Sequence, residues 1–237
     1  MTVNLWRRGL TAVPAEVWQR TDAEVLILAD NELTELPSRI GTFTHLRTLD
    51  LGHNRLARVP EELGALTALS DFLYLHDNRL TALPDSLVRL HRLRYLNVGD
   101  NPLDRLPDAL GELRGLVELR AQRCRLTRLP EHLDGLGRLR ELHLGGNPLT
   151  ALPQSVAALR ELRRLELRDG ALTELPETLA ALPRLRELDL RGNPLRILPD
   201  WLADLPALEK LDLRWTPTRP GHRLVGALED RGCTVYR

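Results

Sequence analysis

The sequence predicts an α/β fold, in which a single solenoid presents a concave parallel sheet of about ten short strands. Three observations predict it. One leucine-based pattern recurs every 23 residues along most of the chain, which is the signature of a stacked repeat. Each recurrence contains a stretch in which leucine alternates with other residues, as in a half-buried strand. Nine of the ten stretches are followed by a proline, after which apolar positions return the chain to the next strand.

The repeat unit is clearest at the position that most units fill with asparagine. This position is occupied in turn by Arg8, Asn31, Asn54, Asn78, Asn101, Cys124, Asn147, Gly170, Asn193 and Thr216. The interval is 23 residues, except between Asn54 and Asn78, where it is 24 because of one extra residue within 69–72. An insertion just before a strand is expected to make a local bulge without shifting the later repeats.

The asparagine has a structural explanation. Its amide both donates and accepts, so it pairs backbone groups that the turn would otherwise bury without partners, and stacking repeats this pairing as a ladder. Cys124 is a weak donor, and we expect a buried structural thiol there. Gly170 has no side chain and should weaken the ladder. Arg8 and Thr216 belong to terminal units, where atypical residues are expected.

The full pattern, LxxLxLxxNxLxxLPxxLxxLxx, resembles the leucine-rich-repeat family. It is similar to the 23-residue subclass found in intracellular Ras-group-related scaffold proteins, over about nine-tenths of the chain. The resemblance implies a leucine-rich-repeat solenoid, or horseshoe, whose concave face binds other proteins. It also implies a small GTPase or a phosphatase subunit as the partner.

The domain organisation follows from where the repeat stops. We expect a repeat array over residues 1–216, with about nine full repeats and a final strand, and a C-terminal cap over 217–237. Within the cap, GHRLVGALEDRG reads as a short amphipathic helix and CTVYR as a strand. The four tryptophans are expected to cover the ends, with Trp6 and Trp18 on the first repeat and Trp201 and Trp215 near the cap.

Composition limits the classes of partner and compartment. The chain has 33 basic and 33 acidic residues, so its charge favours neither nucleic acid nor an acidic membrane surface. No apolar stretch has the length of a membrane span, and the first residues lack the pattern of a signal peptide. The two cysteines, Cys124 and Cys233, do not form disulfide-rich end caps. These features predict a cytoplasmic monomer.

The search for chemistry predicts no enzyme. The sequence lacks a phosphate-binding loop, a dinucleotide motif, a zinc-protease motif, a CxxC pair and a nucleophile elbow. His53 and His76 occupy neighbouring turns and carry, with Asp50 or Asp77, the residue types of a metal site. His143 lies three repeats further on, too far to join them. We therefore expect no metal and no cofactor.

The concave face is formed by the third, fifth and seventh positions of each unit. Three of the five Phe and Tyr residues of the chain meet there. Neighbouring exposed aromatics, together with arginine, are typical of interface hot spots, although they would equally serve to cover the insertion. The predicted binding residues are Phe72, Tyr74, His76, Tyr95, Asn97, Arg120 and His143.

A second feature of this face is a pair of charged rows in the last repeats. They are Glu166, Asp189 and Asp212 beside Arg168, Arg191 and Arg214. Ion pairing between the rows is the expected arrangement. The alternative is a charged docking strip, which would set the orientation and association rate of a partner more than its affinity.

These observations together predict a non-enzymatic protein–protein interaction module or scaffold. One alternative is a secreted bacterial effector that recognises a host protein, although effectors of the ubiquitin-ligase kind have shorter repeats and a catalytic cysteine domain. Another is a glycan-binding protein, for which the aromatic cluster is suitable. A third is a purely structural or engineered repeat scaffold, against which the unequal concave residues and the insertion argue.

Overall fold

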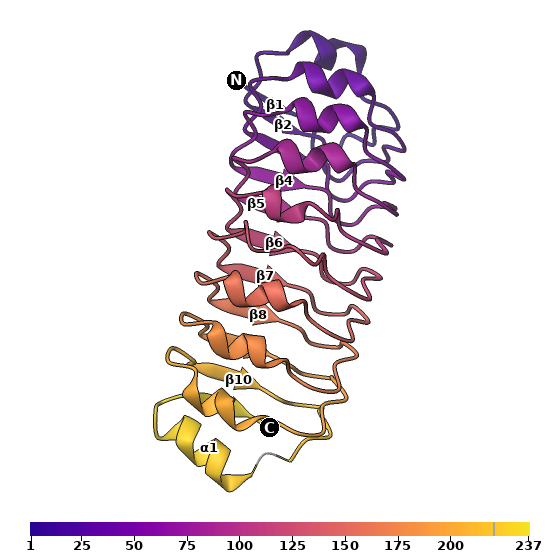
Figure 1. Cartoon of the computed structure of the whole chain (residues 1–237). Coiled ribbons are helices and arrows are strands. Elements are labelled where there is room, and N and C mark those ends of the chain that lie inside the picture. Colours follow the sequence, from indigo (N-terminus) through magenta and orange to yellow (C-terminus); the bar gives the residue numbers. More distant parts are fainter. Residues whose placement is uncertain (220) are drawn as a thin grey trace.

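The chain folds as a stack of coils, each with one short strand, a turn and a return segment (Figure 1). The computed structural model describes residues 1–219 and 221–237. Over these residues, eleven strands form one parallel sheet in chain order. They are β1 (Thr2–Asn4), β2 (Val25–Ile27), β3 (Thr48–Asp50), β4 (Phe72–Tyr74), β5 (Tyr95–Asn97), β6 (Glu118–Arg120), β7 (Glu141–His143), β8 (Arg164–Glu166), β9 (Glu187–Asp189), β10 (Lys210–Asp212) and β11 (Thr234–Tyr236).

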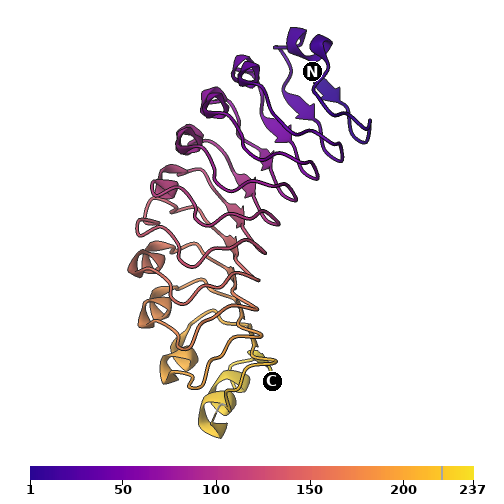
Figure 2. The ribbon, with the colours of Figure 1, turned by 90° about the vertical axis from the view of Figure 1, so that its right-hand side faces the viewer.

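The return segments carry short 3₁₀ helices on the outer side of the arc, opposite the strands (Figure 2). Most begin directly after the repeat proline, whose fixed φ suits the start of a helical turn. Their bounds are Ala15–Gln19, Ser38–Thr42, Glu61–Ala65, Asp85–Arg89, Leu110–Glu112, Gln154–Ala158, Glu177–Ala181 and Asp200–Asp204. The segment 131–138 forms turns instead, and its Gly135 and Gly137 lower the helix propensity there. The leucine-rich-repeat solenoid predicted from the sequence is confirmed.

The strand register preserves the sequence period. Residues 23 apart are partners, as in Val25 and Thr48. The insertion changes this offset to 24 between Thr48 and Phe72, and the next pair, Phe72 and Tyr95, is again 23 apart. The last strand, β11, also pairs with β10 at an offset of 24. The extra residue is accommodated immediately before β4, where the N–H groups of Ser70 and Asp71 both donate to the carbonyl of Arg47. The later repeats are not shifted, as expected.

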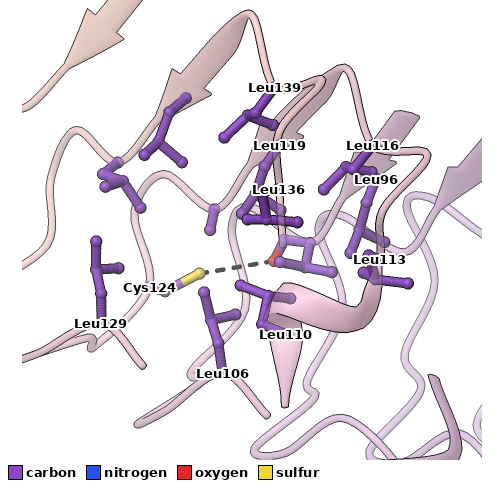
Figure 3. Packing of buried hydrophobic residues seen from close by; sticks show 14 of the residues in the cluster. Leu96, Leu106, Leu110, Leu113, Leu116, Leu119, Cys124, Leu129, Leu136 and Leu139 are labelled. Atoms are coloured by element: carbon purple, nitrogen blue, oxygen red, sulfur yellow. Dashed lines mark hydrogen bonds between the residues drawn. The ribbon is translucent and has the colours of Figure 1, made fainter. Parts of the chain in front are cut away.

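The core is a continuous column of leucine between the sheet and the outer helices. Leucines from successive repeats pack against one another, as Figure 3 shows around Cys124. Leu96, Leu113 and Leu139 there are fully buried. Full burial of one leucine contributes about 2 kcal/mol, and no single repeat encloses its own leucines. Stability therefore comes from stacking.

The asparagine ladder joins each repeat to the one before it. The Asn54 amide donates to the carbonyls of Leu28 and Leu51, at 3.0 and 3.1 Å, and accepts from Leu33 N at 3.0 Å. Two of these three bonds cross to the preceding repeat. The same arrangement recurs at Asn78, Asn101, Asn147 and Asn193.

At the two positions where the ladder lacks an asparagine, a backbone carbonyl accepts the hydrogen bond that the asparagine would have accepted. Where Cys124 would have to accept from Leu103 N, that N–H donates instead to the carbonyl of Asn101, at 2.8 Å. Where Gly170 offers no side chain, Leu149 N donates to the carbonyl of Asn147, at 2.7 Å. The Cys124 thiol donates weakly to the carbonyl of Val98, at 3.6 Å. At Gly170 the ladder therefore lacks the side-chain hydrogen bonds to the preceding repeat, but the N–H of Leu149 still has a partner.

The ends of the array are finished differently. The helix α1 (His222–Glu229) and strand β11, both predicted, pack at the C-terminal end, with Leu224 and Leu228 buried and β11 paired to β10. At the other end, Trp18 is buried against Phe43 at 6.0 Å between ring centroids. Trp201 is half-buried against the core.

The prediction that all four tryptophans cover the ends was wrong for two of them. Trp6 is 50% exposed and Trp215 is 75% exposed. Both lie in the turn that follows a strand, outside the leucine core. Trp6 Nε1 donates to Asp30 Oδ2 at 2.6 Å, and the guanidinium of Arg214 lies 5.6 Å from the ring of Trp215.

Over the described ranges, the longest helices remain too short and too polar to cross a bilayer.

We expect the substitution Asn147→Ala to lower the free energy of unfolding by roughly 3 kcal/mol, because it leaves Leu126 N and the carbonyls of Ala121 and Leu144 buried without partners. Cys124→Ala is the matched control at an interrupted rung, and should cost only about 1 kcal/mol. Urea denaturation followed by circular dichroism measures both. Equal losses for the two variants would contradict the ladder as the main polar link between repeats.

We expect both thiols to resist alkylation in the folded protein. Cys124 and Cys233 are 8% and 3% exposed, and burial raises the pKa of Cys124 to about 11 and also raises that of Cys233. Little thiolate is therefore present at pH 8. Iodoacetamide labelling followed by mass spectrometry should modify neither thiol in the native protein and both in urea. Rapid labelling of Cys124 in the native protein would show that the ladder opens there.

Candidate protein-binding face

The concave face is formed by alternate residues of the strands, so one strand contributes two side chains to it. On β4 these are Phe72 and Tyr74. The register then places Tyr95 of β5 directly beside Phe72. The strand sequence and the pairing together gather three aromatic rings on one surface, with His76 at the end of the same row.

The rings are in mutual contact. Those of Phe72 and Tyr74 are stacked, with centroids 5.7 Å apart and planes 10° apart. The ring of Tyr95 lies 5.5 Å from Phe72 and 5.0 Å from Tyr74, and His76 lies 5.9 Å from Tyr74. Phe72 remains 43% exposed. The predicted grouping of these four residues, which we call the aromatic cluster, is confirmed as geometry.

The aromatic cluster is uncharged at neutral pH. Burial raises the pKa of Tyr95 to about 12 and also raises that of Tyr74. Burial, followed by the neighbouring charge of His53, lowers the pKa of His76. The surface therefore offers two phenol groups and a neutral imidazole at the edge of an apolar patch, which suits an apolar or aromatic side chain with a polar end.

The other three predicted residues differ in accessibility. Arg120 is partly exposed; its Nε donates to Glu118 Oε1 at 2.5 Å, and its guanidinium lies 6.0 Å from the ring of Tyr95. Asn97 is 7% exposed and accepts from Gly99 N at 3.1 Å. His143 is 5% exposed and lies two strands from Tyr95, on β7. Arg120 thus extends the aromatic cluster, whereas Asn97 and His143 lie below the accessible surface.

The seventh positions show a small–large alternation that sequence reasoning missed. The ring of His76 lies over Gly52, so close that a Cβ at residue 52 would overlap it. Gln122 covers Gly99 in the same way, where a Cβ would come within 2.7 Å of the amide carbon. Each glycine is needed for this close approach. The sequence signal for this contact was a glycine at the seventh position of one repeat followed by a long side chain at the seventh position of the next.

The eighth positions form a second row that sequence reasoning did not consider. Their backbone is left-handed in every described repeat, with φ near +55°, for example, at Asp30 and +57° at Asp100. Opposite charges in neighbouring repeats pair within this row, Asp30 with Arg7 and Asp100 with Arg123. His53 belongs to this row and hydrogen-bonds Asp77 at 2.6 Å. The recurrent Asp or Gly at this position was the available signal.

The expected closeness of His53 and His76 is confirmed. Their Nε2 atoms lie 3.2 Å apart, and their ring centroids 4.7 Å. The Nδ1 of His76 is buried without a hydrogen-bond partner. The carboxylate of Asp77 bonds Nδ1 of His53, on the ring edge away from the Nε2 that faces His76, so the three groups do not converge on one point and this pair stays outside the candidate site.

The two charged rows pair with each other, as expected. Each arginine reaches back to the carboxylate two residues earlier: Arg168 to Glu166 at 2.6 Å, Arg191 to Asp189 at 2.6 Å and Arg214 to Asp212 at 2.7 Å. The carboxylate of Asp212 is only 3% exposed. Burial acts to raise the pKa of Asp212, but the hydrogen bonds and charges of Arg214 and Arg191 outweigh it and leave the pKa below its usual value.

The class defined by this architecture is a repeat solenoid with a side-chain-lined concave sheet. Family models described as leucine-rich repeats match residues 71–126, 137–195, 160–217 and 45–66. The chain belongs to the leucine-rich-repeat family. The comparison with curated proteins found no match. Domains of this family generally mediate protein–protein interaction, and the fold is typically a non-enzymatic scaffold.

Solved structures with the same fold include plant and bacterial proteins. A TDR receptor superposes with a TM-score of 0.84 at 25% identity, over 99% of this chain and 42% of the receptor chain. The ectodomain of the membrane receptor kinase GASSHO1/SCHENGEN3 from Arabidopsis thaliana gives 0.77 at 28% identity, over 92% and 30%. The functional domain of InlJ from Listeria monocytogenes gives 0.70 at 20% identity, over 100% and 52%. This chain thus spans about half or less of these three chains.

We expect Asp212→Asn to reduce stability by about 1–3 kcal/mol at pH 7, because it removes charge-assisted hydrogen bonds from Arg214. Since the pKa of Asp212 is lower in the folded protein, its contribution is complete above the unfolded-state pKa of about 3.9 and is lost as the pH falls below it. Urea midpoints at pH 7 and pH 3 measure the change. The difference in stability between the variant and wild type should be smaller at pH 3 than at pH 7.

The matched control for this prediction is Glu209→Gln, which removes an ion pair with Arg186 whose groups are 55% and 61% exposed. An exposed pair of this kind contributes less than about 1 kcal/mol. A difference between wild type and Asp212→Asn that stays constant from pH 7 to pH 3 would contradict the low pKa.

Proposed function

We propose that this chain is a non-enzymatic protein-binding module that holds its partner on the concave face. The aromatic cluster is the observation that carries the proposal. Phe72 is almost half exposed at the centre of three touching rings, and burying such a surface under a partner provides most of the binding energy in many interfaces. The site we propose consists of Phe72, Tyr74, His76 and Tyr95 as anchors, with Asn97, Arg120 and His143 alongside.

We assign these residues different roles within the proposed site. Phe72 and Tyr95 offer ring surface to a partner. Both side chains border a hollow that is also lined by Arg94, Val117 and Glu118. Arg120 supplies a guanidinium beside the ring of Tyr95, where it is held by Glu118. Asn97 and His143 are 7% and 5% exposed, so they would support the contact surface from beneath rather than anchor the partner.

Similar proteins support a protein partner. The GASSHO1/SCHENGEN3 ectodomain was solved in complex with CASPARIAN STRIP INTEGRITY FACTOR 2, and the plant peptide hormone receptor RGFR1 in complex with RGF2. By its sequence resemblance to the 23-residue subclass of Ras-group-related scaffolds, we propose a small GTPase or a phosphatase subunit as the partner. The same proposal includes a cytoplasmic monomer whose residues 217–237 cap the array.

A glycan is the second candidate, because a surface of exposed aromatic rings beside polar groups also stacks against sugar rings. The charged neighbours of the aromatic cluster favour the protein partner. Arg94, Glu118 and Arg120 border the rings, and they provide the charge complementarity that sets the orientation of a protein partner.

The test is an affinity capture from the native lysate with wild type and the triple variant Phe72→Ala, Tyr74→Ala, Tyr95→Ala. The matched control is Ile197→Ala, which removes an apolar side chain that is 78% exposed outside the strands. We expect a protein held by wild type and control and lost by the triple variant, with unchanged circular dichroism. For the purified pair, Tyr95→Ala alone should weaken binding by about thirtyfold, or 2 kcal/mol.

Retention of the same protein by the triple variant would exclude the aromatic cluster, and the variant Arg168→Ala, Arg191→Ala, Arg214→Ala would then test the charged rows. A glycan array probed with wild type and the triple variant addresses the second candidate. Selective glycan binding by wild type with no captured protein would replace the proposed function.

A further inference from the structure

A second cluster on the concave face lies two strands beyond the aromatic cluster. It consists of Glu118 on β6 and Glu141 and His143 on β7, and we call it the His143 cluster. The sheet register makes Glu118 and Glu141 direct partners, and Glu141 and His143 are alternate residues of one strand. One ligand atom from each of the three lies within 4.8 Å of the others.

The two ring nitrogens of His143 face only acceptors. Its side chain is 7% exposed, with Nδ1 2.9 Å from Glu166 Oε2 and Nε2 3.1 Å from Glu141 Oε2. Glu118 Oε1 lies 3.8 Å from the same Nε2. A neutral imidazole has one N–H and one lone pair, whereas an ionised carboxylate only accepts. If Nδ1–H donates to Glu166, the Nε2 lone pair of a neutral ring faces the two remaining carboxylates, and a metal ion between them would be bound by all three groups.

The outer contacts hold this arrangement in place. Glu166 accepts from Nδ1 of His143 and is itself fixed by Arg168 Nε at 2.6 Å. Histidines that bind metals usually donate their other N–H to a carboxylate, which sets the tautomer and the ring orientation. Here that carboxylate comes from a third strand, β8. The cluster is therefore a buried imidazole whose Nδ1 side is held by Glu166 and whose Nε2 side faces two carboxylates.

We propose that the His143 cluster binds a divalent transition-metal ion such as Zn²⁺ through His143 Nε2, Glu118 and Glu141. Imidazole and carboxylate ligands suit this ion, and three protein ligands leave a position open toward the concave face for water or for a group of a partner. From the sequence we expected no metal, because we considered only the pair His53 and His76 as ligands. The proposal does not depend on the identity or existence of a protein partner.

The neighbouring arginines limit the affinity. Arg120 Nε lies 2.5 Å from Glu118 Oε1, and Arg164 Nη1 lies 3.9 Å from Glu141 Oε2. These charges offset part of the negative charge that would attract the ion. We therefore expect micromolar binding of Zn²⁺ rather than the tight binding of a structural zinc site.

The test is calorimetric titration of the untagged protein with ZnCl₂, together with visible absorption of Co²⁺ as a report on coordination. We expect one ion per chain, binding abolished in His143→Gln, and binding about 10–100-fold weaker in Glu166→Gln, which touches only the histidine. His45→Gln, at an exposed histidine, and His53→Gln, at the other histidine pair, should bind as wild type does. Circular dichroism of each variant checks its fold.

Failure of wild type to bind Zn²⁺ would overturn the proposal. Binding that survives His143→Gln but is lost in His53→Gln would overturn it as well, since the ion would then lie at the histidine pair. Because no lysate protein takes part in the titration, these outcomes are independent of the capture experiment.

Discussion

The structure depends on the hydrogen bonding of one amide per repeat. The leucines supply most of the stabilising energy, but a leucine column alone does not fix where each turn lies. The asparagine does so, because it pairs backbone groups from its own repeat and from the preceding one. This constraint aligns successive strands, and the alignment in turn decides which side chains meet on the concave face, including Phe72 beside Tyr95.

The sequence predicts the features that recur in every repeat, namely the strands and their register. It does not predict features that depend on side-chain conformation. Alternating leucines and the 23-residue interval are sufficient for the parallel sheet and its register, and even for the effect of the insertion before β4. The stacking of His76 over Gly52 and the exposure of Trp215 depend on rotamers, which the leucine pattern does not specify, and on a left-handed turn, which is indicated only by the recurrent Asp or Gly at the eighth position. The strand β11 was predictable as a strand, because its residues alternate.

For the candidate sites, the sequence predicted which residues lie on the concave face but not how exposed each of them is. Listing the concave positions was enough to bring Phe72, Tyr74 and Tyr95 together. It did not show that Asn97 and His143 are buried, because burial there depends on how the long neighbours Arg120 and Glu166 fold across the face. For the same reason, the carboxylates around His143 were not recognised as one group, although Glu118, Glu141 and His143 all appear among the concave residues.

The interrupted rungs have a mechanical consequence. A complete rung ties neighbouring repeats with two side-chain hydrogen bonds, whereas the rung at Cys124 provides one weak thiol contact and Gly170 provides no side chain. The local bonds at Leu103 and Leu149 satisfy the backbone but run within a single repeat, so they carry no load along the axis. Under tension applied between the two ends, these junctions are the places where the array separates first, dividing it into segments that extend one after another.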